Sequence, residues 1–177
     1  MHRITAVIAI SLAALLVAVS LTPYAAAADD LTPEQAERIK TNCVTIKSSL
    51  SQLHASDALL RVNRGQVYES MASKLMETFN GRLSSNRLDN RAMVAVTTNY
   101  RNTLTTFRTD YIAYEKKLSE AIRIDCTTQP YTFHAALQEA RTLRGAVHDD
   151  VSELHLLIDD YRSSVGGFLV NFERVSS

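Results

Sequence analysis

Apolar residues recur at alternating spacings of three and four along three long segments of this chain. This spacing places them on one face of an α-helix, and an average period of 3.5 residues is typical of helices that supercoil in coiled coils and bundles. We therefore predict an all-α fold, an antiparallel up-down-up three-helix bundle. Its helices are expected at about residues 32–82, 88–125 and 130–172, within a single domain over residues 31–173.

Capping residues mark where the first helix begins. Thr32 precedes Pro33, which suits the first helical position, and Gln35 stands where a capping box requires it. An alternative fold breaks this helix near Ser56 or Gly65 and forms four shorter helices. The three-helix fold remains our main prediction.

The predicted core faces follow from the same spacing. In the first helix the face consists of Ile39, Cys43, Ile46, Leu50, Leu53, Asp57, Leu60, Arg64, Val67, Met71, Leu75, Phe79 and Leu83. In the second helix it consists of Met93, Thr97, Tyr100, Leu104, Phe107, Tyr111, Tyr114, Leu118 and Ala121.

The N-terminus has the features of a secretory signal peptide. A basic start, Met1-His2-Arg3, is followed by an apolar run over residues 4–21 and by small residues that end at Ala28. We predict a signal peptide over residues 1–28. The alternative is a retained anchor, because about 18 apolar residues are near the minimum for a membrane span. Both interpretations predict an extracytoplasmic protein, secreted or at the cell envelope.

The two cysteines indicate how the first two helices align. Export would allow Cys43 and Cys126 to form a disulfide. Residues at the same level of an antiparallel helix pair have numbers with a constant sum, so this pair places the turn at about residue 84 or 85, inside the polar segment 80–86. We therefore predict a Cys43–Cys126 disulfide. The alternative is a pair of buried thiols.

The same relation predicts a polar layer in the core. Applied to both turns, it makes the first and third helices parallel, with an offset of about 88 residues. Asp57 then lies level with Arg144 and close to Tyr114 of the second helix. Because an unpaired buried charge is costly, we predict a buried polar layer formed by Asp57, Arg144 and Tyr114 that fixes the register. A binding site at this layer is the alternative.

Charge and motif content argue against several functions. The chain has 19 basic and 19 acidic residues, so we expect no nucleic-acid partner. The histidines and aspartates of segment 148–160 lack the spacings of zinc hydrolases and of carboxylate-bridged bundles, so no metal and no cofactor are expected. The sequence has no nucleophile elbow and no C-x-x-C motif. We therefore expect a protein that is not an enzyme.

Three arginines cluster at the first turn. Arg82, Arg87 and Arg91 form a candidate contact tip for a protein or an anionic envelope surface. We therefore expect a non-enzymatic exported helical module for protein contact or spacing at the cell envelope. The alternative is a bundle that binds a small ligand or a metal ion in the extracytoplasmic space. Membrane contact would come only from an uncleaved N-terminal segment.

The mature chain also resembles exported two-cysteine helical-bundle proteins of reduced-genome bacteria. The resemblance covers about residues 31–173, and it rests on Cys43, Arg61-x-x-Arg64-x-x-x-Tyr68, the turn at Arg82-Leu83, Cys126-x-x-x-Pro130-x-x-Phe133 and Ala140-Arg141-x-x-Arg144. It implies a signal peptide and a helical bundle. That group has no known activity, so the resemblance implies no catalytic residue.

Overall fold

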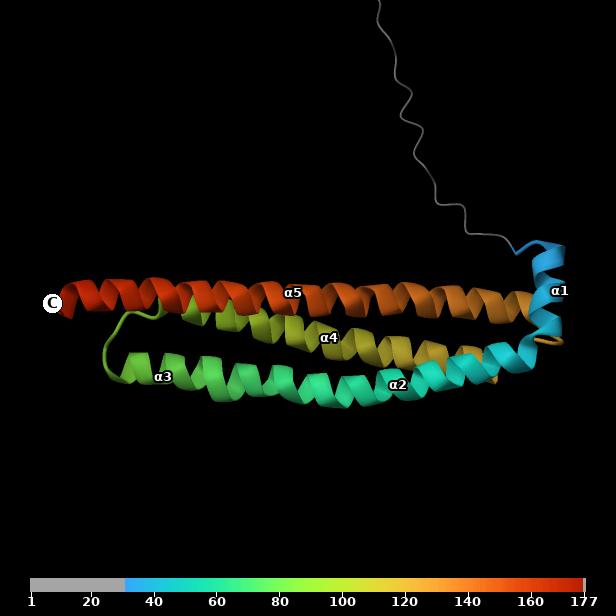
Figure 1. Cartoon of the computed structure of the whole chain (residues 1–177), viewed down its shortest axis with the longest axis horizontal. Helices are drawn as coiled ribbons and strands as arrows, with labels where there is room; N and C mark the ends of the chain where they lie inside the picture. The colour runs from blue at the N-terminus through green and yellow to red at the C-terminus, as the bar shows by residue number, and fades with distance from the viewer. Residues whose placement is uncertain (1–30, 177) are drawn as a thin grey trace, which may run out of the picture. The chain divides into compact units, whose positions relative to one another are not determined.

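The computed structural model describes residues 31–176, and the regular structure in this range is entirely helical (Figure 1). The elements are α1 (Pro33–Thr41), α2 (Cys43–Ser70), the π-helical segment η1 (Met71–Met76), α3 (Glu77–Ser85), α4 (Arg91–Arg123) and α5 (Pro130–Ser176). Because α2, η1 and α3 form one continuous helix, the alternative break near Ser56 or Gly65 is wrong. The predicted signal peptide, residues 1–28, lies outside the described range. Within that range, none of the helices is both long and apolar enough to cross a membrane.

The prediction of one unbroken first helix over residues 32–82 was wrong at Asn42. The predicted capping box is present, since the Gln35 amide donates to Thr32 Oγ1 at 3.2 Å and the Thr32 amide donates to Gln35 Oε1 at 2.8 Å. Asn42 then leaves helical geometry, with φ −102° and ψ 11°. Its side chain donates to the Arg38 carbonyl at 2.8 Å, which satisfies an acceptor at the end of α1. As a result, α1 turns across the end of the other helices (Figure 1).

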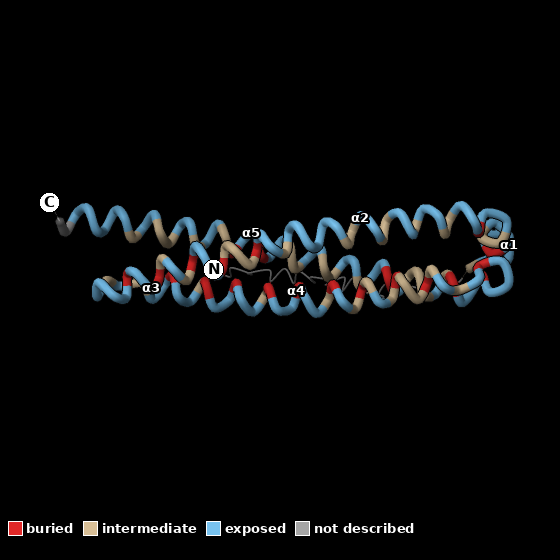
Figure 2. The backbone as a smooth tube through the Cα atoms, turned by 90° about the horizontal axis from the view of Figure 1, so that it is seen from below, coloured by how far each residue is buried: buried red, intermediate tan, exposed pale blue. Residues whose placement is uncertain are grey.

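The long helices lie side by side, but they do not pack equally. The backbones of α4 and α5 are in close contact. The backbone of α2 has fewer close contacts with α4, and it has the fewest with α5. All nine residues predicted for the core face of the second helix are buried in α4, and buried positions recur along it in Figure 2. Contacts between Asp57 and Arg144 and between Tyr68 and His155 both join residues 87 positions apart. This separation shows that α2 and α5 run parallel, close to the predicted offset.

From Leu60 onward, the core face of α2 and η1 is rotated relative to the prediction, whereas Cys43 and Leu50 lie in the core as predicted. Leu60, Val67 and Leu75 are 50%, 55% and 60% exposed, whereas Tyr68 and Met76 are buried. The helix carries two adjacent apolar stripes, and the one that contains Tyr68 and Met76 packs against the aromatic residues of α4. The other stripe, with Leu60, Val67 and Leu75, is left exposed.

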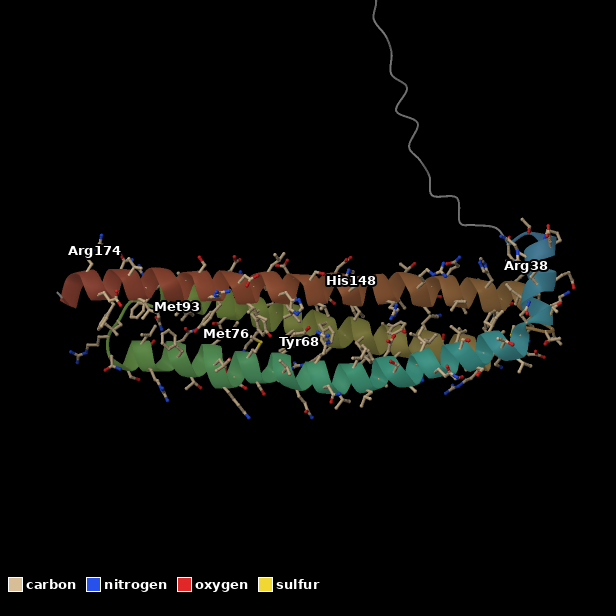
Figure 3. All side chains as sticks on the ribbon, viewed as in Figure 1. Arg38, Tyr68, Met76, Met93, His148 and Arg174 are labelled. Carbon is tan, nitrogen blue, oxygen red and sulfur yellow. A yellow bond between two sulfur atoms is a disulfide. The ribbon has the colours of Figure 1, made fainter. Side chains whose placement is uncertain are left out.

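Two tyrosines, the buried Tyr100 and the half-buried Tyr161, contact backbone carbonyls just before and at the end of the π-helical segment. Widened π turns direct backbone carbonyls away from the regular i to i−4 pattern. The Tyr100 hydroxyl donates to the Tyr68 carbonyl at 3.2 Å, and the Tyr161 hydroxyl lies 3.1 Å from the Met76 carbonyl. The irregular helix is therefore held by donors from α4 at one end and from α5 at the other. Figure 3 shows Tyr68 and Met76 on the side of the helix that faces these partners.

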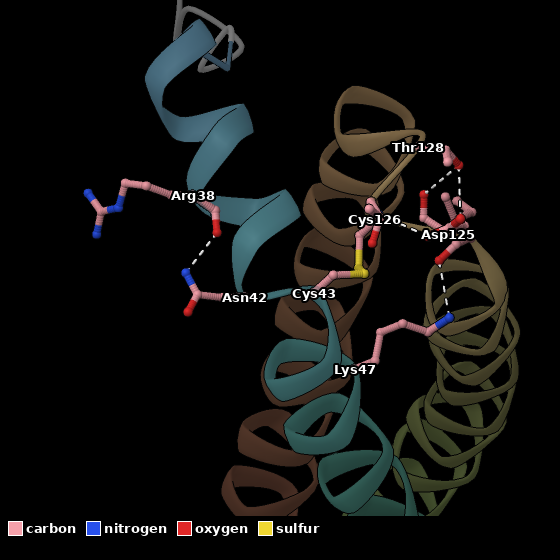
Figure 4. Close-up of a disulfide and its surroundings, with 9 residues drawn as sticks. Arg38, Asn42, Cys43, Lys47, Asp125, Cys126 and Thr128 are labelled. Atoms are coloured by element: carbon pink, nitrogen blue, oxygen red, sulfur yellow. Dashed lines mark hydrogen bonds between the residues drawn. A yellow bond between two sulfur atoms is a disulfide. The ribbon is translucent and has the colours of Figure 1, made fainter.

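A disulfide closes the end of the bundle next to α1. Cys43 and Cys126 are bonded, with their Cα atoms 5.5 Å apart (Figure 4). Phe133 packs against the pair, and Lys47 Nζ donates to the Ile124 carbonyl at 3.3 Å. The first residue of α2 is thus fixed to the connection between α4 and α5.

Candidate functional site

A groove of about 330 Å³ opens at mid-length between α2, α4 and α5. It exists because α2 and α5 both pack on α4 while their backbones stay apart. The aromatic residues of its lining are Tyr68, Phe107, Tyr111 and Tyr114, and the aliphatic residues are Leu60, Val147 and Val151. Its polar rim consists of Asp57, Arg61, Arg64, Arg144 and His148. Such a concave, largely apolar site with a few polar groups is typical of small-molecule binding.

The structure brings Asp57, Tyr114 and Arg144 together at one end of this groove. The Tyr114 hydroxyl donates to Asp57 Oδ2 at 2.6 Å, and Arg144 Nε donates to the same oxygen at 3.1 Å. The side chain of Asp57 is 12% exposed, but that of Arg144 is 53% exposed. The expectation of a buried layer was therefore wrong for Arg144. Its guanidinium reaches Asp57 from the open side, because α5 does not close over α2.

Burial raises the pKa of two tyrosines of the groove, Tyr114 and Tyr111. Burial raises the pKa of Tyr114 far above its usual value, and the hydrogen bond to Asp57 raises it further. Burial also raises the pKa of Tyr111, with a smaller contribution from the Asp57 charge. Both hydroxyls therefore remain hydrogen-bond donors throughout the neutral pH range.

Two further arginines of the groove are not neutralised by a carboxylate. The Arg61 guanidinium lies 5.0 Å from the centre of the Tyr111 ring, a cation–π contact. Among residues 31–176, no hydrogen bond or ion pair involves the Arg64 side chain. No role in a site was predicted for Arg61 or Tyr111, and His148 was considered only as part of the polar segment 148–160. The spacing of three between Arg61 and Arg64, which places them on one helix face, was the available signal.

The three predicted tip arginines are held in different settings. Arg91 makes a two-point ion pair with Asp89, at 2.8 and 3.0 Å, and this arginine lowers the pKa of Asp89 to about 2. Arg87 adopts a left-handed conformation, with φ 57°, in the turn after α3. Arg82 lines a separate shallow hollow between α3 and α5. One of the three positive charges is thus already neutralised.

A Ser, His and Glu cluster was missed by the sequence arguments. His54 Nε2 lies 3.0 Å from Glu115 Oε1 and 3.3 Å from Ser119 Oγ. In a catalytic triad the histidine uses opposite ring nitrogens for the nucleophile and for the carboxylate. Here both contacts involve the same nitrogen, so the cluster lacks the geometry of a proton relay.

The histidines of segment 148–160 lie apart from each other. His155 Nε2 is 3.2 Å from the Tyr68 hydroxyl, whereas His148 lines the groove. Within residues 31–176, no three His, Cys, Asp or Glu side chains are grouped so that they could hold a metal ion.

An acidic pair lies between α4 and α5. Burial, together with the charge and hydrogen bond of Asp110 and the charge of Asp149, raises the pKa of Asp150 from 3.8 to about 6. Among the described residues, Asp150 Oδ2 is buried without a hydrogen-bond partner. At neutral pH this carboxylate is therefore ionised in an unfavourable setting.

Replacement of Asp150 by asparagine is expected to stabilise the fold at pH 7.5. The pKa of Asp150 is higher in the folded than in the unfolded chain, so its contribution to stability is greatest below about pH 4 and is lost as the pH rises through 6. Allowing for partial solvent screening, we expect a gain of about 1 to 2 kcal/mol at pH 7.5 and little or none at pH 4. Urea unfolding at both pH values measures it. Asp159→Asn, at an exposed position of α5, is the control, and equal gains from both variants would contradict the prediction.

No protein-family profile, curated protein or solved structure matches this chain.

Proposed function

We propose that this protein is an exported, non-enzymatic helical binding module, and that the groove between α2, α4 and α5 is its ligand site. The observation that carries this proposal is the open groove of about 330 Å³ with buried aromatic residues beneath a charged rim. Ligand sites commonly have volumes of about 300 to 1,000 Å³, so the groove would take one compact organic molecule.

The proposal includes the setting of this module. We propose a signal peptide over residues 1–28 and an up-down-up three-helix bundle formed by α2–η1–α3, α4 and α5. The Cys43–Cys126 disulfide supports an oxidising, extracytoplasmic location, because such bonds persist mainly outside the cytoplasm. An exported binding module would meet its ligand in the extracellular medium or at the cell envelope.

Protein contact or spacing at the envelope is the second candidate function. It is favoured by large apolar side chains exposed on α2, since Val44, Leu59 and Val62 are 84%, 64% and 51% exposed. Exposed apolar surface can mark a protein interface. The groove favours small-ligand binding, because it combines apolar and charged groups in a concave site.

Filling the groove is expected to abolish binding of a neutral aromatic probe. Leu60 and His148 line opposite walls, and both are exposed, so tryptophan at these positions can enter the groove without displacing core residues. For Leu60→Trp/His148→Trp we expect the affinity for N-phenyl-1-naphthylamine to fall at least about tenfold. The wild type contains no tryptophan, and the test and control variants each carry two, so their tryptophan emission is matched and probe emission can be compared between them.

The matched control places the same residues one position away. Leu59 and Asp149 are exposed but do not line the groove, and a neutral probe is insensitive to the charge that is lost at Asp149. Leu59→Trp/Asp149→Trp should bind the probe within about twofold of the wild type. Equal loss in both double variants, or no saturable binding to the wild type, would refute the groove as a ligand site.

A further inference from the structure

We infer that the groove selects small amphipathic anions, with an apolar ring body and a carboxylate, sulfonate or phosphate group bound by Arg64 and Arg61. The inference rests on the proposed function and specifies its ligand class. It follows from the charge balance of the groove and from the hydrogen-bond donors left open there.

The groove has more positive than negative charge. Its lining contains three arginines and one carboxylate, Asp57. Asp57 is already bound by Arg144 and Tyr114. Arg61 and Arg64 therefore keep their charges, and like charges three residues apart on a helix repel each other. An anion bound between them would remove this repulsion.

Two arginines of α4 show a different pattern. Arg101 is paired with Glu77, and Arg108 is paired with Glu69. Arg64 lies on the same stretch of helix as Glu69, yet among residues 31–176 it has no carboxylate partner. Its guanidinium thus offers a planar pair of donors to a ligand, the geometry that suits carboxylate, sulfonate and phosphate groups.

The surroundings of these arginines suit both the anionic group and the apolar part of such a ligand. Tyr111 lines the groove, and within the described chain its hydroxyl makes no hydrogen bond. Because this hydroxyl stays protonated, it can donate to an anionic oxygen. Val147 and Val151 supply aliphatic surface on the facing helix. A single small molecule can enter a concave site of this size, whereas a flat bilayer surface cannot.

A pair of matched probes tests the inference. The anion 8-anilinonaphthalene-1-sulfonate has the same ring system as N-phenyl-1-naphthylamine plus one sulfonate, so the ratio of their affinities isolates the effect of the charge. We expect the wild type to prefer the anion by at least about tenfold, as for a charge-assisted hydrogen bond. Arg61→Gln/Arg64→Gln should remove most of this preference, measured as the ratio of the two affinities in the same variant.

Arg162→Gln controls for the loss of a positive charge outside the groove, because Arg162 is exposed on α5. It should keep the anion preference. An unchanged preference in Arg61→Gln/Arg64→Gln, or equal loss in Arg162→Gln, would overturn the inference while leaving the proposed function in place. Failure of both probes to bind the wild type would refute the proposed function. If Arg61→Gln/Arg64→Gln loses binding to phosphatidylglycerol vesicles but keeps its binding to the sulfonate probe, these arginines belong to a membrane contact. That result would overturn the small-molecule inference.

Discussion

Replacement of both Cys43 and Cys126 by serine is expected to lower the free energy of unfolding by about 4 kcal/mol. The disulfide joins residues 83 positions apart, and closing a loop of that length restricts the unfolded chain by roughly 4 to 5 kcal/mol in the loop-entropy description. Urea unfolding followed by far-ultraviolet circular dichroism measures the change.

Reduction provides the control for this prediction. The wild type in dithiothreitol should approach the stability of Cys43→Ser/Cys126→Ser, whereas dithiothreitol should leave the double variant unchanged. A loss below about 1 kcal/mol would show that the cross-link adds little to the packing of Cys43, Cys126 and Phe133.

Asp57→Ala is expected to have the second largest effect, a loss of about 2 to 3 kcal/mol in the free energy of unfolding. Tyr114 is 3% exposed, so its hydroxyl would be left buried without the acceptor that it now contacts at 2.6 Å. Arg144 would also lose its partner, but its exposed guanidinium can be hydrated. Thermal and urea unfolding at pH 7.5 measure the loss.

Two further variants separate these contributions. Arg144→Gln should cost less than about 1 kcal/mol, because half-exposed ion pairs add little. Tyr114→Phe combined with Asp57→Ala should cost less than the sum of the single changes, since the phenylalanine removes the buried hydroxyl. If Arg144→Gln is as destabilising as Asp57→Ala, the ion pair rather than the tyrosine hydrogen bond governs this cluster.

The fold of α4 could be predicted almost completely from the sequence. Its apolar residues keep one spacing from Met93 to Ala121, and α4 is packed by neighbours along that whole face. When a helix has a single apolar stripe and partners along its length, the stripe determines which side is buried. The cysteine pairing was predictable for a related reason. In an antiparallel helix pair, the position of the turn determines which residues lie at the same level, and the turn at residues 80–86 places Cys43 level with Cys126.

The orientation of α2 could not be predicted in the same way. Its two stripes differ by one residue, so Val67 and Tyr68 are about equally suited to the core by spacing alone. The choice depends on α4, where Tyr100 and Phe107 receive Tyr68 and its neighbours. Periodicity within one helix contains no information about which aromatic residues face it.

The groove was unpredictable because it depends on a distance between helices. Asp57 and Arg144 could be placed at the same level from the sequence. Their level along the helices does not determine the distance between the two helix axes. The exposed Arg144 shows that α5 stays back from α2 at this level. The groove, and with it the roles assigned to Arg61 and Arg64, follows from that separation.

The π-helical segment is the place in this helix where the loss of one residue is expected to disturb the fold least. A π segment accommodates one more residue than an α-helix does over the same stretch. A deletion of a single residue within Met71–Met76 would restore regular α-helical pitch while leaving α3 with the same side toward α4. The same deletion within α2 would instead rotate every later residue of that helix by about 100°. A single-residue deletion in this helix is thus best tolerated at Met71–Met76, where the extra residue of the π segment can be removed.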